Sequence, residues 1–188
     1  MSINMEGYTE DLLAMRVVEG SAVTPAVGDL YEVDALSPRL SEKDAAAFHS
    51  TVARASYMAQ RSRPDLLTAA AFLTTRVMEP TEQDDGKLHR MLRYLNGTKE
   101  MGIRLKGEPG PIHVTAYADA SYGVYADCKS HTGVVILVEH GPVHVSSRSR
   151  KQKLAWKSSM EAELIGVSGA LSQGVPFREL RWLLMRWD

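Results

Sequence analysis

The sequence predicts an α+β protein, with a helical first half followed by an antiparallel sheet that carries a helix on one face. Two observations lead to this division. Between residues 41 and 97, apolar residues recur at helical spacing behind acid-rich helix starts. Between residues 101 and 149, short β-branched runs are separated by Gly and Pro. We therefore expect two domains, residues 1–100 and residues 101–188.

The helical half is expected to start with a short helix in residues 8–18, before an extended connector that contains Pro25, Gly28 and Pro38. A long helix should occupy residues 41–60. Ser62 is the expected N-cap of the next helix, because Pro64 suits an early helical position and an acid follows at Asp65. That helix should bury Leu66, Ala69, Ala70, Leu73 and Val77.

The last helix of this half is framed by two signals. Thr81 is its expected N-cap, with acids in the first turn, and Gly97 is its expected stop. Its buried face should be formed by Leu88, Met91, Leu92 and Leu95.

The second half should contain strands in residues 101–107, 111–119, 131–140 and 142–149, with a hairpin turn at 140–142. A helix is expected over 157–173, and Pro176 should break or restart it before a last amphipathic segment, 177–187. The apolar stripe of this helix should consist of Met160, Leu164, Val167 and Leu171.

Composition narrows the function classes. The chain has 188 residues, a net charge of −1 and 44% hydrophobic residues, so the total charge does not indicate a strongly basic nucleic-acid binder. The single cysteine, Cys128, excludes an internal disulfide and a Cys-rich zinc site. No apolar run has the length of a membrane span, and the N-terminus has no signal-peptide layout. We expect an intracellular protein, cytoplasmic or nuclear, that is not secreted and has no membrane partner.

Asp119 is the first candidate catalytic residue, because it stands where an apolar strand ends. A glutamate from the following helix could join it, and a divalent cation such as Mg²⁺ would relieve the repulsion between the two carboxylates. Glu161 and Glu163 lie roughly 200° apart around the helix axis, so only one can face Asp119. Glu163 lies closer to the apolar stripe, which makes Asp119 and Glu163 the predicted catalytic and metal-binding pair. The alternative is that both acids are solvated surface charges.

Two groups of basic residues are candidates for phosphate contacts. Arg148, Arg150, Lys151 and Lys153 follow the hairpin and form the predicted nucleic-acid-binding cluster. Lys87, Arg90 and Arg93 flank the last helix of the first half. For both groups a solvated face remains the alternative.

Several short motifs together resemble copia-type retrotransposon Pol polyproteins. In the second half these are YADASYG, DCKSHTGVVILVEHGPVHVSSRSRKQ and SSMEAELIGVSGA, which are similar to the ribonuclease H domain of that family, with Met160 where threonine is usual. In the first half, SAVTPA, SRPDLLTAAAFL, PTEQ and LRYLNGT are similar to the end of the preceding reverse transcriptase, a thumb or connection-like helical part.

The resemblance implies metal-dependent hydrolysis of the RNA strand of RNA–DNA hybrids. Asp119 matches the first metal-binding aspartate of the family and Glu163 its helix glutamate. The family holds two Mg²⁺ ions with four acids, and the other two acids lie on a later strand and helix than this chain contains. We therefore expect a C-terminally truncated ribonuclease H-like domain that is inactive alone. Its expected partners are an RNA–DNA hybrid or another nucleic acid and the remainder of the polyprotein. The alternative is a non-catalytic nucleic-acid-binding or structural remnant.

Overall fold

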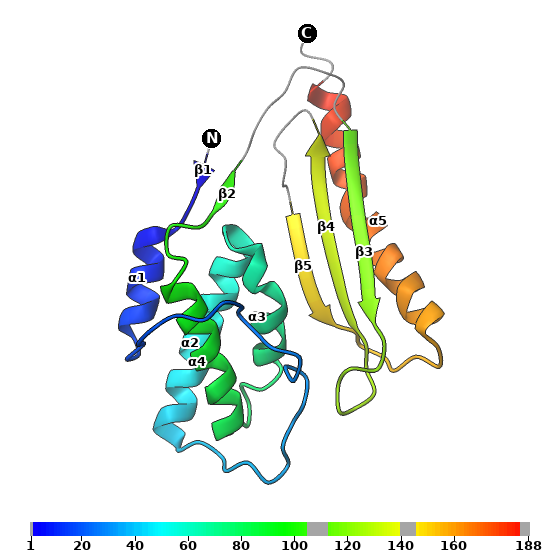
Figure 1. The fold of residues 1–188 in the computed structure, drawn as a ribbon. Coiled ribbons are helices and arrows are strands. Elements are labelled where there is room, and N and C mark those ends of the chain that lie inside the picture. Colours follow the sequence, from blue (N-terminus) through cyan, green and yellow to red (C-terminus); the bar gives the residue numbers. More distant parts are fainter. Residues whose placement is uncertain (1, 105–112, 140–145, 185–188) are drawn as a thin grey trace. The chain divides into compact units, whose positions relative to one another are not determined.

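The computed structural model describes residues 2–104, 113–139 and 146–184. The chain divides into two compact units, one formed by residues 4–102 and the other by strand β1 (Ser2–Ile3) together with the residues from Ile103 onward. The first is helical, while the second combines strands with one long helix (Figure 1). The predicted α+β class is confirmed.

The helical unit contains four α-helices and one 3₁₀ turn within the described residues. They are α1 (Glu6–Ala14), α2 (Glu42–Arg61), the 3₁₀ turn η1 (Pro64–Leu66), α3 (Leu67–Thr74) and α4 (Glu82–Asn96). Their apolar faces form a common core, which includes the fully buried side chains of Leu12, Phe48, Val52, Met58, Leu66, Leu73, Leu88 and Leu92. All four residues of the predicted α4 face are buried.

The ends of α4 agree with the expected signals. The Thr81 hydroxyl accepts a hydrogen bond from the Asp84 backbone N–H, and the Asp84 carboxylate accepts one from the Thr81 N–H, which completes a capping box. Gly97 occupies the C-cap position. Two of the donors left free at a helix start are thereby satisfied.

The prediction for Ser62 was wrong. Ser62 ends α2 as its C-cap, and its N–H donates to the Met58 carbonyl at 3.0 Å. Because Pro64 starts a 3₁₀ turn directly, Arg63 precedes that turn without a side-chain cap. The predicted α3 face is buried from Leu66 to Leu73, but α3 ends at Thr74, so Val77 lies outside it.

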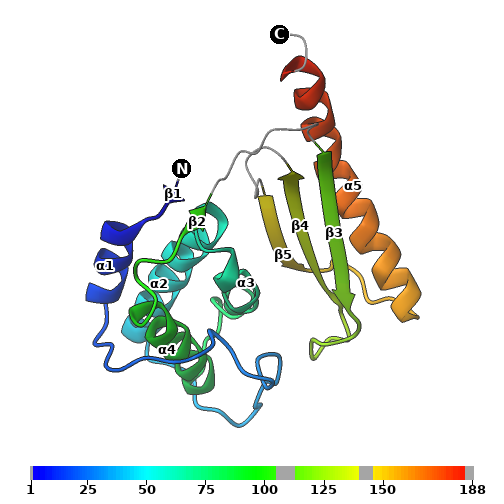
Figure 2. The same cartoon turned by 45° about the horizontal axis from the view of Figure 1, so that its top comes forward.

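The second unit contains an antiparallel sheet in the order β3-β4-β5, with β3 (His113–Ser121), β4 (His131–Glu139) and β5 (Ser146–Lys151). Helix α5 (Ser159–Leu184) lies along one face of this sheet (Figures 1 and 2). β1 pairs separately with β2 (Ile103–Arg104), which lies within the expected strand 101–107. The expected turn at 140–142 lies outside the described residues.

The predicted packing face of α5 was wrong. Met160, Leu164, Val167 and Leu171 are all exposed, by 46% to 72%. The side chains buried against the sheet are small, at Ala162 and Ala170, and Gly166 between them is buried too. Residues four apart lie on one helix face, and small ones let the helix approach the strands closely. Ala170 packs in a cluster with Val134, Ile136 and Ala118.

The expectation for Pro176 was also wrong, because α5 continues through it to Leu184. Proline removes one backbone N–H, while the other hydrogen bonds of a 26-residue helix remain on both sides of it. None of the helices in the described ranges is long and apolar enough to cross a membrane.

Candidate active site and nucleic-acid interface

Asp119 lies near the end of β3, opposite Gly133 of β4, and is exposed. Its neighbour Ala118 packs with Val134 and Ile136 on the side of the sheet that α5 covers. Successive side chains of a strand point to opposite faces. The pleat therefore assigns the Asp119 side chain to the face that α5 does not cover.

The backbone of Asp119 nevertheless lies against α5. A Cβ built on Gly166 would be 3.7 Å from the Asp119 carbonyl oxygen, so strand and helix are in close contact at this point. Glu163 lies one helical turn before Gly166 and is half-buried. Glu161 is exposed, and its carboxylate accepts a hydrogen bond from the Lys157 N–H at 2.9 Å. Glu163 is thus the less exposed of the two helix acids.

Asp119 and Glu163 are the predicted metal-binding pair. The described part of the chain contains no group of three or more His, Cys, Asp and Glu residues that could hold a metal ion. Asp119 and Glu163 offer carboxylate oxygens, which fit Mg²⁺ in kind because this ion commonly takes one or two carboxylates and keeps several waters. Two carboxylates do not supply the ligands that a pair of ions would need.

Two residues of the predicted basic cluster, Arg150 and Lys151, lie on opposite faces of β5. On β5, Arg150 pairs with Thr132, and its Nη2 would lie 3.3 Å from a Cβ built on Gly169 of α5. Lys151, the next residue, points to the opposite face, as alternation requires. Lys153 is exposed in the segment between β5 and α5. Arg148 pairs with Val134, but its side chain lies outside the described residues.

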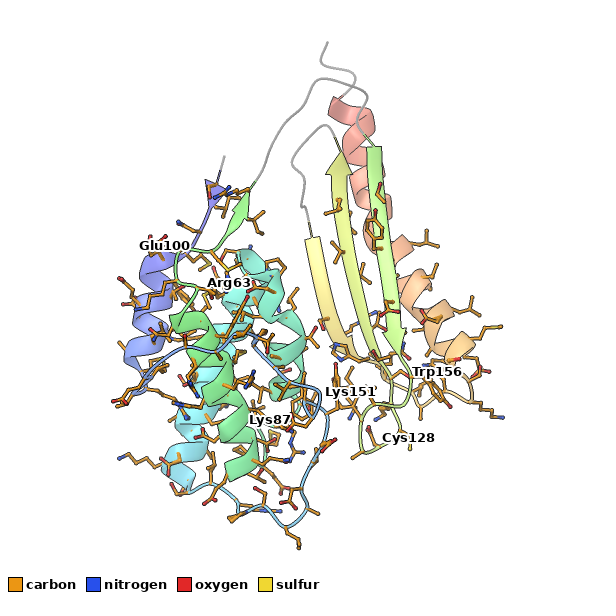
Figure 3. The ribbon with its side chains drawn as sticks, viewed as in Figure 1. Arg63, Lys87, Glu100, Cys128, Lys151 and Trp156 are labelled. Atoms are coloured by element: carbon orange, nitrogen blue, oxygen red, sulfur yellow. The ribbon has the colours of Figure 1, made fainter. Side chains whose placement is uncertain are left out.

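Lys151 is held by two neighbours at the end of the sheet where β3 leads into the turn (Figure 3). Its Nζ lies 4.4 Å from the centroid of the Tyr125 ring and 2.8 Å from the Asp127 carboxylate. Lys129 reaches the other oxygen of the same carboxylate at 2.9 Å. Desolvation acts to raise the pKa of Asp127, but hydrogen bonds and charges from Lys151 and Lys129 outweigh it and lower the pKa to about 2.

A buried hydrogen-bonded chain lies beneath Lys151 and was missed by sequence reasoning. The Tyr125 hydroxyl and His131 Nδ1 are 2.8 Å apart, and His131 Nε2 is hydrogen-bonded to the Ser149 hydroxyl. Burial lowers the pKa of His131 to about 4, so the imidazole is neutral at pH 7. The hairpin register, which places His131 opposite Lys151, was the signal that could have grouped these residues.

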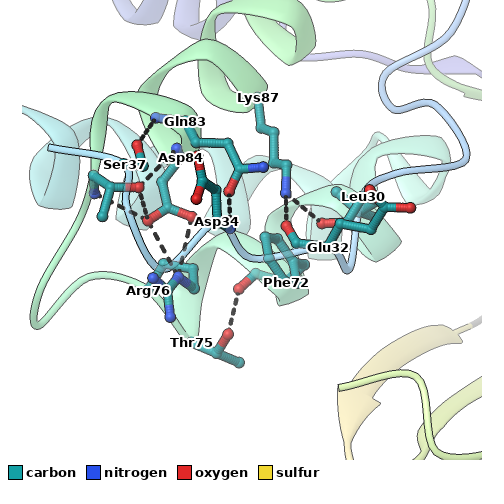
Figure 4. A network of polar contacts seen from close by, with 11 residues as sticks. Leu30, Glu32, Asp34, Ser37, Phe72, Thr75, Arg76, Gln83, Asp84 and Lys87 are labelled. Atoms are coloured by element: carbon teal, nitrogen blue, oxygen red, sulfur yellow. Dashed lines mark hydrogen bonds and ion pairs between the residues drawn. The ribbon is translucent and has the colours of Figure 1, made fainter. Parts of the chain in front are cut away.

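The basic residues along α4 bind the connector between α1 and α2. From the sequence they were expected either to contact phosphate or to form a solvated face. Figure 4 shows the contacts of Lys87. Lys87 Nζ donates to the carbonyls of Leu30, at 3.0 Å, and Glu32. Arg90 donates to the Thr24 hydroxyl and Arg93 to the Ser21 carbonyl. Desolvation lowers the pKa of Lys87 from its usual value.

The chain is similar to proteins encoded by transposons. It is 32% identical, over 97% of its length, to the retrovirus-related Pol polyprotein from transposon RE2 of Arabidopsis thaliana, of which it spans 12%. It is 31% identical, over 77% of its length, to a transposon Ty5-1 protein of Saccharomyces cerevisiae, of which it spans 46%. It is also 29% identical, over 73% of its length, to the secreted RxLR effector protein 161 of Plasmopara viticola, of which it spans 91%. No family model and no solved structure matches the chain.

Proposed function

We propose that this chain, a relative of the copia-type retrotransposon Pol polyproteins, takes part in metal-dependent hydrolysis of the RNA strand of RNA–DNA hybrids. The resemblance to these polyproteins is confirmed by its relatives. The proposed activity belongs to the second unit, in which an antiparallel sheet carries one helix, an arrangement consistent with a ribonuclease H-like fold. The helical unit is proposed to be the end of the reverse transcriptase.

The contact between Gly166 and the Asp119 carbonyl carries this proposal. It holds the end of β3 beside α5, one turn from Glu163, so that one acid comes from the strand and one from the helix. For the Asp119 and Glu163 carboxylates to hold one Mg²⁺, the end of β3 would have to turn the Asp119 side chain towards α5; the ion would then supply an activated water and neutralise charge on the scissile phosphate. The exposure of Asp119 leaves it accessible to a nucleic-acid backbone.

Because this chain is expected to be inactive alone, the test is cleavage of an RNA–DNA hybrid labelled on its RNA strand by the polyprotein that contains the chain, with Mg²⁺ and with EDTA in place of it. Cleavage should require Mg²⁺ and should be abolished by Asp119→Asn and by Glu163→Gln. Glu161→Gln is the matched control, because it removes the same charge from an exposed position on the same helix. Full cleavage by Asp119→Asn would overturn the proposed roles.

A non-catalytic nucleic-acid-binding role is the second candidate. It is favoured by the lack, among the described residues, of any group of three metal-ligating side chains. This role predicts that the chain, folded by circular dichroism, binds the hybrid and that the polyprotein containing it shows no cleavage that depends on Asp119. Cleavage that depends on Asp119 would exclude it.

A further inference from the structure

Lys129 and Lys151 both form ion pairs with the carboxylate of Asp127 at the end of the sheet. Lys129 Nζ lies 2.9 Å from one oxygen of Asp127, and Lys151 Nζ lies 2.8 Å from the other. The Asp127 side chain is 43% exposed, whereas those of Lys129 and Lys151 are 33% and 27% exposed. The two lysine side chains are thus less exposed than the Asp127 side chain they bind, which is open to solvent.

The lysine pair is held in place by the surrounding structure. The Tyr125 ring lies beneath Lys151, and its hydroxyl is fixed by His131. Two backbone hydrogen bonds close the turn, from the Tyr125 N–H to the Lys129 carbonyl and from the Cys128 N–H to the Tyr125 carbonyl. Cys128 has a φ of 57°, a left-handed conformation that is uncommon for a residue other than glycine. The closed turn therefore fixes the places of Asp127 and Lys129, while Lys151 is placed by β5 and by the Tyr125 ring.

We propose that Lys129 and Lys151 form a binding site for one phosphate of a nucleic-acid backbone, and that Asp127 occupies this site in the free protein. Carboxylate and phosphate oxygens accept the same charge-assisted hydrogen bonds from ammonium groups. A phosphate that accepts from both ammonium groups replaces the bonds that Asp127 gives up, and the open side chain of Asp127 can move into solvent. This site rests on the proposed function for its ligand, an RNA–DNA hybrid; it adds Lys129 to the residues that contact the hybrid and makes Asp127 the group that competes with it.

The site predicts opposite effects for the two kinds of substitution. Binding of a fluorescent RNA–DNA hybrid, measured by anisotropy in EDTA over a series of salt concentrations, should weaken in Lys129→Met and Lys151→Met. Loss of the whole site in Lys129→Met/Lys151→Met should reduce the slope of log K against log salt concentration by about 1. Asp127→Asn should tighten binding by about two- to fivefold at low salt, the range expected for loss of an exposed competing pair.

A double-mutant comparison separates this site from a general charge effect. The gain from Asp127→Asn should vanish when Lys129 and Lys151 are both Met, because no site remains to be vacated. Glu161→Gln removes the same charge elsewhere in the unit and should leave binding unchanged. A gain from Asp127→Asn that persists in the Lys129→Met/Lys151→Met background would overturn the proposal. Lys129→Arg and Lys151→Arg, which keep the charge, should retain most of the binding and so show that loss in the Met variants is not misfolding.

A second probe distinguishes failure of the site from failure of the proposed function. Inorganic tripolyphosphate, titrated while the lysine side chains are followed by NMR, should shift Lys129 and Lys151 more strongly in Asp127→Asn than in the unchanged protein. Hybrid binding or cleavage that does not depend on these lysines would refute the site and leave the proposed function standing. Tripolyphosphate binding at the lysines without any hybrid binding would support the anion site and refute its nucleic-acid ligand.

Discussion

Arg63 is buried against Thr98, a residue 35 positions further along the chain. Its Nη1 donates to the Thr98 carbonyl at 2.8 Å, and its Nη2 donates to the Thr98 hydroxyl at 2.7 Å. The Asp65 carboxylate accepts from the same guanidinium at 2.7 Å, and the Tyr94 ring lies 5.6 Å from it. One side chain, 2% exposed, thereby joins the start of η1 to the residues after α4.

Arg63→Met should destabilise the protein by about 3 kcal/mol, because it leaves the Asp65 carboxylate and the Thr98 carbonyl without their partner. Urea denaturation followed by circular dichroism would measure the change. Arg61→Met is the matched control, since Arg61 is an exposed residue of α2 that contacts only the Tyr57 ring among the interactions described for it. Equal stability of the two variants would contradict the structural role of Arg63.

Because α5 buries small residues and exposes large apolar ones, we expect substitutions at its small residues to be the more destabilising. Ala162→Leu should cost about 1–3 kcal/mol through overpacking, because Ala162 is fully buried. Leu164→Ala should change stability by less than about 0.5 kcal/mol, since Leu164 is 62% exposed. Thermal unfolding of both variants would compare them, and a larger loss in Leu164→Ala would show that the large residues are the ones that pack.

The buried imidazole of His131 predicts that stability depends on pH below neutrality. Its pKa is lowered from 6.5 to about 4, so between these values the unfolded chain binds a proton that the folded chain excludes. Stability should therefore be constant, as far as this group is concerned, above pH 6.5 and fall towards pH 4 by on the order of 3 kcal/mol.

The measurement is urea unfolding at a series of pH values between 4 and 7. His131→Asn should flatten the dependence in this window, whatever it does to the stability at pH 7. His49→Gln is the control, because His49 is exposed on α2. An unchanged pH dependence in His131→Asn would show that another group is responsible.

The hydrogen bonds of Lys87 should protect the connector from proteolysis. Lys87→Met should free the carbonyls of Leu30 and Glu32 and increase cleavage between residues 20 and 36. Limited proteolysis with a protease that does not cut at lysine, followed by mass spectrometry, would detect it. Lys99→Met, which changes another lysine of the same unit, should leave the cleavage pattern unaltered.

Local signals in the sequence predicted much of the fold. Thr81 and Gly97 delimit α4 because capping depends on residues a few positions apart. The strands β3 and β4 follow from β-branched runs bounded by turn residues. The boundaries predicted at Pro176 and Ser62 were wrong. Each rested on a local preference of that residue, which the longer helices α5 and α2 override.

The candidate site was less predictable than the fold. The resemblance picked out Asp119 and Glu163, but the spatial relation between strand and helix depends on Gly166, which carries no chemical signal. The stripe from Met160 to Leu171 misled because hydrophobicity predicts burial, whereas the helix approaches the sheet through its smallest side chains. The link from Asp127 to Lys151 joins a turn to a distant strand end, which requires the register of three strands.

The pairing of β1 with β2 has a consequence for how the chain can be rearranged. Ile3 of β1 lies opposite Ile103 of β2, so the first and last residues of the helical unit lie next to each other. In topological terms, residues 4–102 are an insertion between β1 and β2, and the pairing of these two-residue strands holds its ends together. Segments with adjacent ends are the ones that tolerate transplantation and circular permutation. The helical unit is therefore suited to being excised, or grafted into a surface hairpin of another protein, as a self-contained cassette.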